Sequence, residues 1–175
     1  MIKYARIMNE ETGICEVGLG TDTAFYEEIG MTLQDVELSE INEQWYLKDK
    51  CPHYSDAEKL EQAKQEKIAE NDTVRDAALN QGVTYQNILF DSDTDQKINL
   101  LATVSVMPDG ATVEWFGMNN DSLVCTKEDL MNIGNLIIAL HSFVWNRNAE
   151  IKEEINKAGT IEEVNAIVID YGENK

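Results

Sequence analysis

A long segment near the C-terminal end carries apolar residues at positions 130, 133, 137, 140, 144, 151 and 155, and the intervals alternate between three and four as far as 144. This spacing places them on one face of an α-helix. Thr126 followed by Asp129 is typical of a helix N-terminus, so the sequence predicts a helix over residues 127–157. At ~1.5 Å per residue this helix is about 45 Å long, longer than a small globular body requires. It must therefore pack on the helices before it or on copies of itself.

The apolar face of this helix allows two interpretations. Two heptads fall short of the three or four that define a coiled coil, which favours ordinary packing within the molecule. The alternative is a face for a partner protein or for self-association, which would give a homo-oligomer through the long helix. The residues that would form this face are Leu130, Ile133, Ile137, Leu140 and Val144.

The charge of the chain restricts its partners. Its 175 residues include 33 acidic and 14 basic ones, a formal net charge of −19, and the acidic residues are spread along the whole length. Such a surface repels nucleic-acid phosphates and anionic lipids, so we expect a protein partner, no nucleic acid and no membrane. The N-terminus lacks the apolar core of a secretory signal and no later segment resembles a transmembrane span, which predicts a cytoplasmic protein.

The pattern of elements predicts an α+β protein of two modules. Residues 1–52 form a small N-terminal module with a β-hairpin, a short helix and a second pair of strands. Pro52 cannot donate to a sheet, so we place a boundary there. Residues 53–175 form a helix-rich α+β domain. Its expected elements are a charged helix from Asp56 to about Leu79, a strand over 83–90, a helix after Asp93, a β-hairpin over 111–126, the long helix and a short final helix.

Three aspartates spaced two residues apart, Asp91, Asp93 and Asp95, resemble the first ligands of a calcium loop. Such a loop also needs glycine at its sixth position and glutamate at its twelfth, where this sequence has Gln96 and Ala102. A helix start explains more of the stretch, because an N-cap aspartate accepts backbone N–H groups and a second one complements the positive helix end. The sequence leaves cation binding by these residues open.

Residues suited to catalysis or metal ligation are scarce. The two histidines are His53 and His141, and the chain has no phosphate-binding loop, nucleophile elbow or zinc-protease motif. Cys51 and His53 are too close in sequence for a usual zinc knuckle, which disfavours a site shared with Cys125 and His141. We expect His141 to be partly buried with one ring nitrogen satisfied. The sequence therefore predicts no enzyme, no catalytic residue, no metal and no cofactor.

Several segments together resemble a known family. They read GVTYQNILFDSDTDQKINLL, ATVEWFGMNNDSLVCTKEDLMNIGNLIIALHSFVW and INKAGTIEEVNAI. The shared features are an aromatic F-D-x-D segment that opens a helix, a turn before V-x-W, a Thr-capped long helix and a closing A-x-T-x-E-E-[LV] segment. Residues from about 55 to 170 thus resemble a domain of unknown function found in phage and prophage tail-fibre-associated proteins. Residues 1–50, with YARIMNEETGICEVGLG and WYLKDKCP, similarly resemble small tail proteins of phages and prophages of Gram-positive bacteria.

The resemblance implies a role in a bacteriophage tail and supplies no catalytic residue. The expected function is that of a tail-fibre assembly chaperone that binds a fibre protein in the host cytoplasm. The alternative is a structural tail-fibre or baseplate component that remains in the virion tail. A further alternative is a host-recognition module that binds calcium or sugar through the aspartates and through Trp45 and Trp115, because tryptophan rings can stack on sugars.

Overall fold

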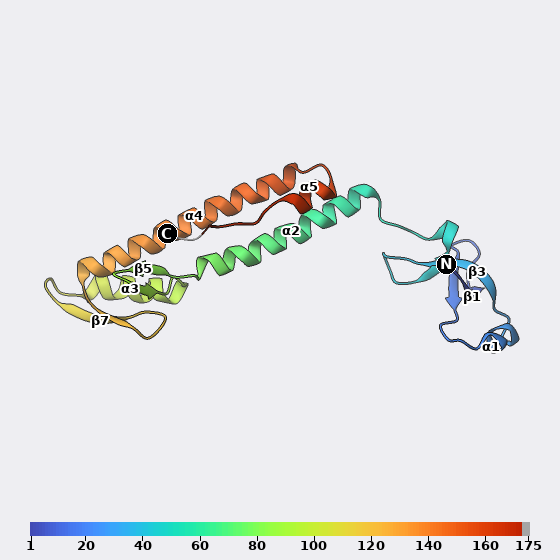
Figure 1. The fold of residues 1–175 in the computed structure, drawn as a ribbon, viewed down its shortest axis with the longest axis horizontal. Helices are drawn as coiled ribbons and strands as arrows, with labels where there is room; N and C mark the ends of the chain where they lie inside the picture. The colour runs from blue at the N-terminus through green and yellow to red at the C-terminus, as the bar shows by residue number, and fades with distance from the viewer. Residues whose placement is uncertain (173–175) are drawn as a thin grey trace. The chain divides into compact units, whose positions relative to one another are not determined.

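The computed structural model describes residues 1–172 of the chain (Figure 1). The chain divides into two compact units, Met1–Lys59 and Leu60–Lys175. The combination of long helices with short strands confirms the α+β class. The division falls inside helix α2 (Asp56–Leu79) rather than at Pro52. The first turn of α2 remains with the first unit, where Lys59 Nζ lies 3.1 Å from Glu40 Oε1.

The first unit is a four-stranded antiparallel barrel. Its strands follow the closed order β1-β2-β4-β3, with β1 (Ile2–Ile7), β2 (Ile14–Val17), β3 (Thr32–Leu38) and β4 (Trp45–Leu47). The short helix α1 (Thr23–Glu28) joins β2 to β3, and a 3₁₀ turn, η1 (Lys48–Lys50), follows β4. The hydrophobic cluster of this unit is small, with Ala5, Cys15 and Val36 as its buried members. The expected hairpin, short helix and second strand pair are therefore present, and they close into a barrel.

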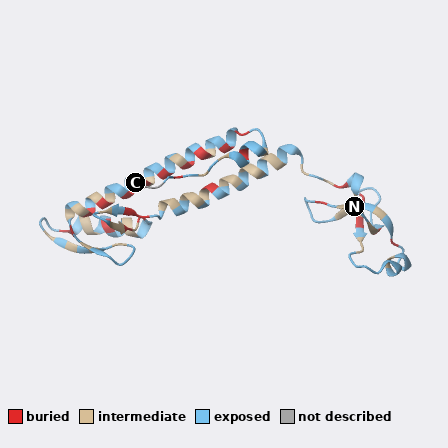
Figure 2. Ribbon diagram, viewed as in Figure 1, coloured by how far each residue is buried: buried red, intermediate tan, exposed pale blue. Residues whose placement is uncertain are grey.

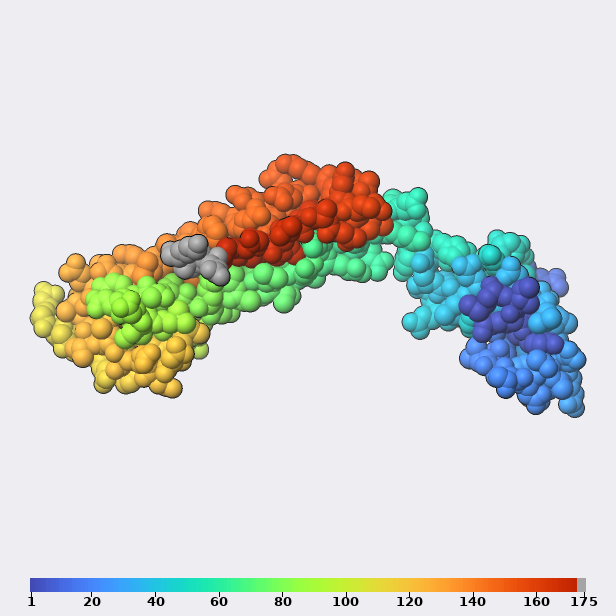
Figure 3. Space-filling model, viewed as in Figure 1, coloured from blue at the N-terminus to red at the C-terminus, as the bar shows by residue number. Residues whose placement is uncertain are grey.

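The second unit is built around one long helix. After α2 come β5 (Val83–Tyr85), β6 (Ile88–Phe90), α3 (Thr94–Val106), β7 (Thr112–Phe116), β8 (Ser122–Thr126), α4 (Lys127–Lys157) and α5 (Ile161–Ala166). Helices α2 and α4 run alongside one another, and the chain after α5 returns along them (Figure 1). In the space-filling view this returning segment, coloured red, lies against both helices (Figure 3). Strands β5 and β8 and helix α3 contact α4.

Residues 83–90 form a hairpin, so the expectation of a single strand was wrong. Strands β5 and β6 pair antiparallel, with Tyr85 opposite Ile88. Gln86 and Asn87 between them both have positive φ, 49° and 65°, as the two central residues of a type I′ turn require. Glycine usually marks such a turn and is absent here, which is why the sequence did not reveal it.

Side-chain caps fix where the two long helices begin. At α2, the Glu58 N–H donates to Ser55 Oγ at 3.2 Å and the Ser55 N–H donates to Glu58 Oε2 at 2.8 Å. At α4, Thr126 and Asp129 form the same reciprocal pair. Each pair satisfies backbone donors that have no partner within the helix. Helix α4 consequently spans Lys127–Lys157, as the sequence predicts.

One continuous hydrophobic core runs along α4. It combines the buried face of α4 with side chains from the hairpins, α3 and the C-terminal segment, including Phe90, Leu100 and Tyr171. In Figure 2 the buried residues form an interrupted red stripe along α4. None of the helices within residues 1–172 combines the length and the apolarity that a bilayer crossing needs.

A buried polar cluster lies within this core. Asn71 Nδ2 donates to Asn148 Oδ1 at 2.8 Å, and the Tyr171 hydroxyl donates to Asn71 Oδ1 at 2.7 Å. These three side chains are at most 5 % exposed. Burial is the main cause that raises the pKa of Tyr171. Because α2, α4 and the C-terminal segment each supply one member, the cluster fixes their mutual register.

Candidate partner-binding groove

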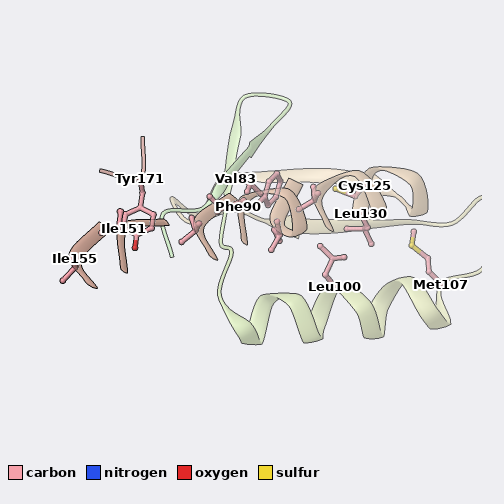
Figure 4. Packing of buried hydrophobic residues seen from close by; sticks show 13 residues of the cluster. Val83, Phe90, Leu100, Met107, Cys125, Leu130, Ile151, Ile155 and Tyr171 are labelled. Atoms are coloured by element: carbon pink, nitrogen blue, oxygen red, sulfur yellow. The ribbon is translucent and has the colours of Figure 1, made fainter. Parts of the chain in front are cut away.

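The residues that the sequence offers as a partner face are occupied by the protein itself. Leu130, Ile133, Ile137, Leu140 and Val144, which we call the core stripe, are 0–2 % exposed. They pack against buried residues from β5, β6 and α3. Figure 4 shows Leu100 extending from α3 toward Leu130. The core stripe is therefore intramolecular core, and a docking face has to be sought among other residues.

A second apolar stripe lies beside the core stripe on α4. Met131, Gly134 and Ile138, which we call the groove stripe, each follow a core residue by one position, about 100° around the helix. Met131 is 51 % and Ile138 is 64 % exposed. Together with α3 this stripe borders a groove of about 310 Å³. The apolar residues that line it include Leu100, Leu101, Val104, Met131, Gly134 and Ile138.

Gly134 allows α3 and α4 to approach closely along this groove. A Cβ atom at this position would lie 3.2 Å from Leu100 Cδ2, closer than ordinary van der Waals contact. On the α3 side, Leu101 projects from the groove edge and is 69 % exposed. A side chain at position 134 would therefore narrow the groove, which is flanked by exposed apolar side chains from both helices.

Most of the residues that line the groove lie in two parts of the sequence that lack charge. Residues 130–146 include no aspartate, glutamate, lysine or arginine, and neither do residues 98–108. The acidic residues that give the chain its net charge of −19 all lie elsewhere. An apolar patch of this kind, rimmed by a strongly polar surface, is typical of protein interaction sites.

Lys97 is the single charged residue among those that line the groove within residues 1–172. It is half-buried, and its Nζ lies 3.4 Å from His141 Nδ1. His141 Nε2 lies 3.0 Å from the Ser92 carbonyl oxygen. Since a carbonyl accepts only, the ring proton resides on Nε2, and Nδ1 accepts from Lys97. His141 is thus half-buried, as the sequence predicts. Both of its ring nitrogens contact polar partners, whereas only one was expected to do so from the sequence.

The three aspartates before α3 serve the helix start. Asp93 is the N-cap, and its carboxylate accepts from the Gln96 N–H at 2.7 Å. Asp95 lies in the first turn, where it complements the positive end of the helix. Within residues 1–172 no group of three or more histidine, cysteine or acidic side chains is arranged to hold a metal ion. This arrangement supports the helix-start interpretation of the stretch.

The remaining candidates for chemistry are dispersed. Cys51 and His53 belong to the first unit, whereas Cys125 and His141 belong to the second. All three cysteines are free and buried, and burial raises the pKa of the Cys125 thiol to about 11. A thiol with so high a pKa is a poor nucleophile near neutral pH.

The aromatic candidates are divided between interior and surface. Trp45 is half-buried on β4 with Lys3 Nζ 5.2 Å from its ring centroid, and Tyr46 beside it is buried. Trp115 is half-buried on β7, whereas Phe116 is 57 % exposed. Their alternation follows the two faces of each strand, as the sequence predicts for paired aromatics.

Asp129 connects the start of α4 to the β5–β6 hairpin. Its carboxylate accepts from the Thr126 N–H and hydroxyl and from the Tyr85 hydroxyl, the last at 2.8 Å. The bonds from Thr126 are the main cause that lowers the pKa of Asp129. This carboxylate therefore fixes the α4 end nearest the groove and remains ionised at neutral pH.

The fold and the groove define a two-unit α+β protein whose second unit presents a largely apolar groove beside its longest helix. Residues 62–171 match the family model described as a domain of unknown function (DUF4376). This match covers more than half of the chain, and the chain belongs to that family. It includes both the groove and the buried polar cluster. Comparison with curated proteins and with solved structures gives no match.

Proposed function

We propose that this chain is a phage or prophage tail-associated protein that acts as an assembly chaperone for a tail-fibre protein. In this proposal the occupant of the groove is an apolar segment of the fibre protein, covered there until the fibre assembles. Binding takes place in the cytoplasm of the bacterial host, and the chain contributes no catalytic step. The phage context comes from the resemblance of residues 55–170 to tail-fibre-associated proteins.

The observation that carries the proposal is the exposure of apolar side chains from α4 and α3 along the groove. Ile138 is 64 % and Leu101 is 69 % exposed in a chain of net charge −19. Surface of this kind costs free energy in water, at roughly 25 cal/mol per Å² of apolar area, unless another molecule covers it. A cationic partner would be attracted to acidic surface anywhere on the molecule. The groove instead favours an apolar segment, because none of the described residues that line it is acidic and no carboxylate has to be desolvated there.

Co-expression with a tail-fibre gene of the same phage or prophage tests the proposal. The fibre protein should become soluble in the presence of the wild-type chain and should co-purify with it. Ile138→Glu places a charge at the groove and should abolish both effects, because an unpaired carboxylate is costly to bury. Val124→Glu is the matched control, since Val124 on β8 is 66 % exposed and does not line the groove.

Two outcomes would redirect or overturn the proposal. If neither variant nor wild type changes fibre solubility, the chaperone function is wrong. If purified phage particles contain the chain in a fixed ratio to the fibre, the protein is a structural tail component and the groove holds the fibre permanently. Mass spectrometry of purified particles distinguishes these two roles.

A further inference from the structure

We infer that the segment bound in the α3–α4 groove carries a carboxylate that pairs with Lys97. This inference rests on the proposed function and specifies the chemistry of the partner. It runs against the net charge of the chain, which by itself would favour a cationic partner. Its basis is the position of Lys97, the one charged residue among the described residues that line a largely apolar groove.

Lys97 lines the groove and has no carboxylate partner among the described residues, whereas the arginines of the chain do. Arg6, Arg75 and Arg147 each pair with at least one carboxylate. Within residues 1–172, Lys97 has no ion pair, and its nearest polar contact is a neutral imidazole nitrogen at 3.4 Å. Other half-buried lysines also lack an ion pair, but Lys64 and Lys127 each donate to a backbone carbonyl oxygen, of Asn156 and Met107. Among the described contacts Lys97 has neither a carboxylate nor a carbonyl acceptor.

The contact with His141 leaves the ammonium group of Lys97 with unused hydrogen-bond donors. An ammonium group has three donors, and His141 Nδ1 can accept one of them. The long contact to His141 orients the lysine without neutralising its charge. The remaining donors are free for an acceptor that enters along the groove.

The apolar surroundings decide which acceptor fits best. An occupant that fills the groove displaces water from Leu101, Val104 and Ile138, and electrostatic interactions strengthen as water leaves. A carboxylate beside Lys97 then forms a charge-assisted pair, whereas a neutral occupant leaves the ammonium group desolvated and unpaired. The preferred segment therefore combines apolar side chains with one acidic group.

Decanoate is a probe of this chemistry, because it joins an apolar chain to a carboxylate. We expect decanoate, below its micellar concentration, to bind the full-length protein and to shift the imidazole NMR signals of His141. His53 in the first unit serves as the internal reference. Decanol, which lacks the charge, should bind about tenfold more weakly. Equal affinity for decanoate and decanol would overturn the inference.

Variants of Lys97 test the role of its charge. Lys97→Met keeps the aliphatic stem and should weaken both decanoate binding and fibre binding about tenfold, with decanol binding unchanged. Lys97→Arg keeps the charge and should restore most of the affinity. A urea titration of each variant confirms that it is folded. Unchanged fibre binding by Lys97→Met would contradict the inference.

Failure of this inference is distinguishable from failure of the proposed function. If Ile138→Glu blocks fibre binding and Lys97→Met does not, the groove binds the fibre without carboxylate recognition, and only the inference falls. If decanoate binds through Lys97 and Ile138→Glu leaves fibre binding intact, the groove takes a free amphiphile. In that case both the inference and the proposed function are wrong.

Discussion

The two apolar stripes of α4 have opposite surroundings although they lie side by side on one helix. The core stripe is covered by α3 and the hairpins, and its residues are 0–2 % exposed. The groove stripe borders α3 but stays open, with Met131 51 % and Ile138 64 % exposed. Apolar spacing therefore identifies the helix, whereas the position of its neighbours decides which stripe stabilises the fold and which is free to bind.

The largest difference between the stripes should appear on truncation to alanine. Leu140→Ala removes a fully buried side chain and should lower the free energy of unfolding by about 3 kcal/mol. Ile138→Ala removes a mostly exposed one and should change it by less than about 0.5 kcal/mol. Urea denaturation followed by circular dichroism measures both variants. Similar losses would show that the groove stripe is also part of the stabilising core.

A smaller loss of stability should follow a substitution in the buried polar cluster, to which α4 contributes Asn148. Asn148→Ala leaves Asn71 Nδ2 without its acceptor in an interior site and should cost about 2 kcal/mol. Asn146→Ala is the matched control, because Asn146 lies on the same helix and is exposed, so it should change stability by less than about 0.5 kcal/mol. Equal effects in the same urea titration would mean that the buried cluster contributes nothing to stability.

Local signals in the sequence were sufficient for the elements that position the groove. The Ser55 and Thr126 caps, the aspartates before α3 and the apolar spacing over 130–155 all act within a few residues or along one helix. The structure shows each of them as the sequence indicates. The β5–β6 hairpin was missed because its Gln-Asn turn lacks the usual glycine.

The groove itself could not be identified from the sequence. Met131 and Ile138 are apolar and seven residues apart, but their spacing does not reveal which flank of α4 remains uncovered. That depends on where α3 packs, which is set by contacts such as the one between Leu100 and Gly134. Lys97 likewise gains its significance only when α3 brings it to His141. The uncharged run over 130–146 was the one available signal.

The smallest effect on stability should come from a change at the boundary between the stripes, Gly134→Ala. Alanine favours a helix interior by about 1 kcal/mol over glycine, but its Cβ would lie 3.2 Å from Leu100 Cδ2. Leu100 lines the groove and can rotate slightly toward it, so part of the gain is lost to repacking. We expect a net stabilisation below about 1 kcal/mol in the urea titration.

The same substitution should have the opposite effect on binding. The added methyl group and the displaced Leu100 both reduce the depth of the groove at Gly134, so decanoate affinity should fall while the protein becomes slightly more stable. Gly110→Ala does not offer a matched control, because Gly110 has a φ of +78° that strains alanine. The matched control is Ala139→Gly, on the exposed side of α4. It should lower the free energy of unfolding by about 1 kcal/mol and leave decanoate binding unchanged. Stronger decanoate binding by Gly134→Ala would contradict this expectation. It would mean that the added apolar contact outweighs the lost depth, so that the close approach of α3 and α4 does not limit which ligands fit the groove.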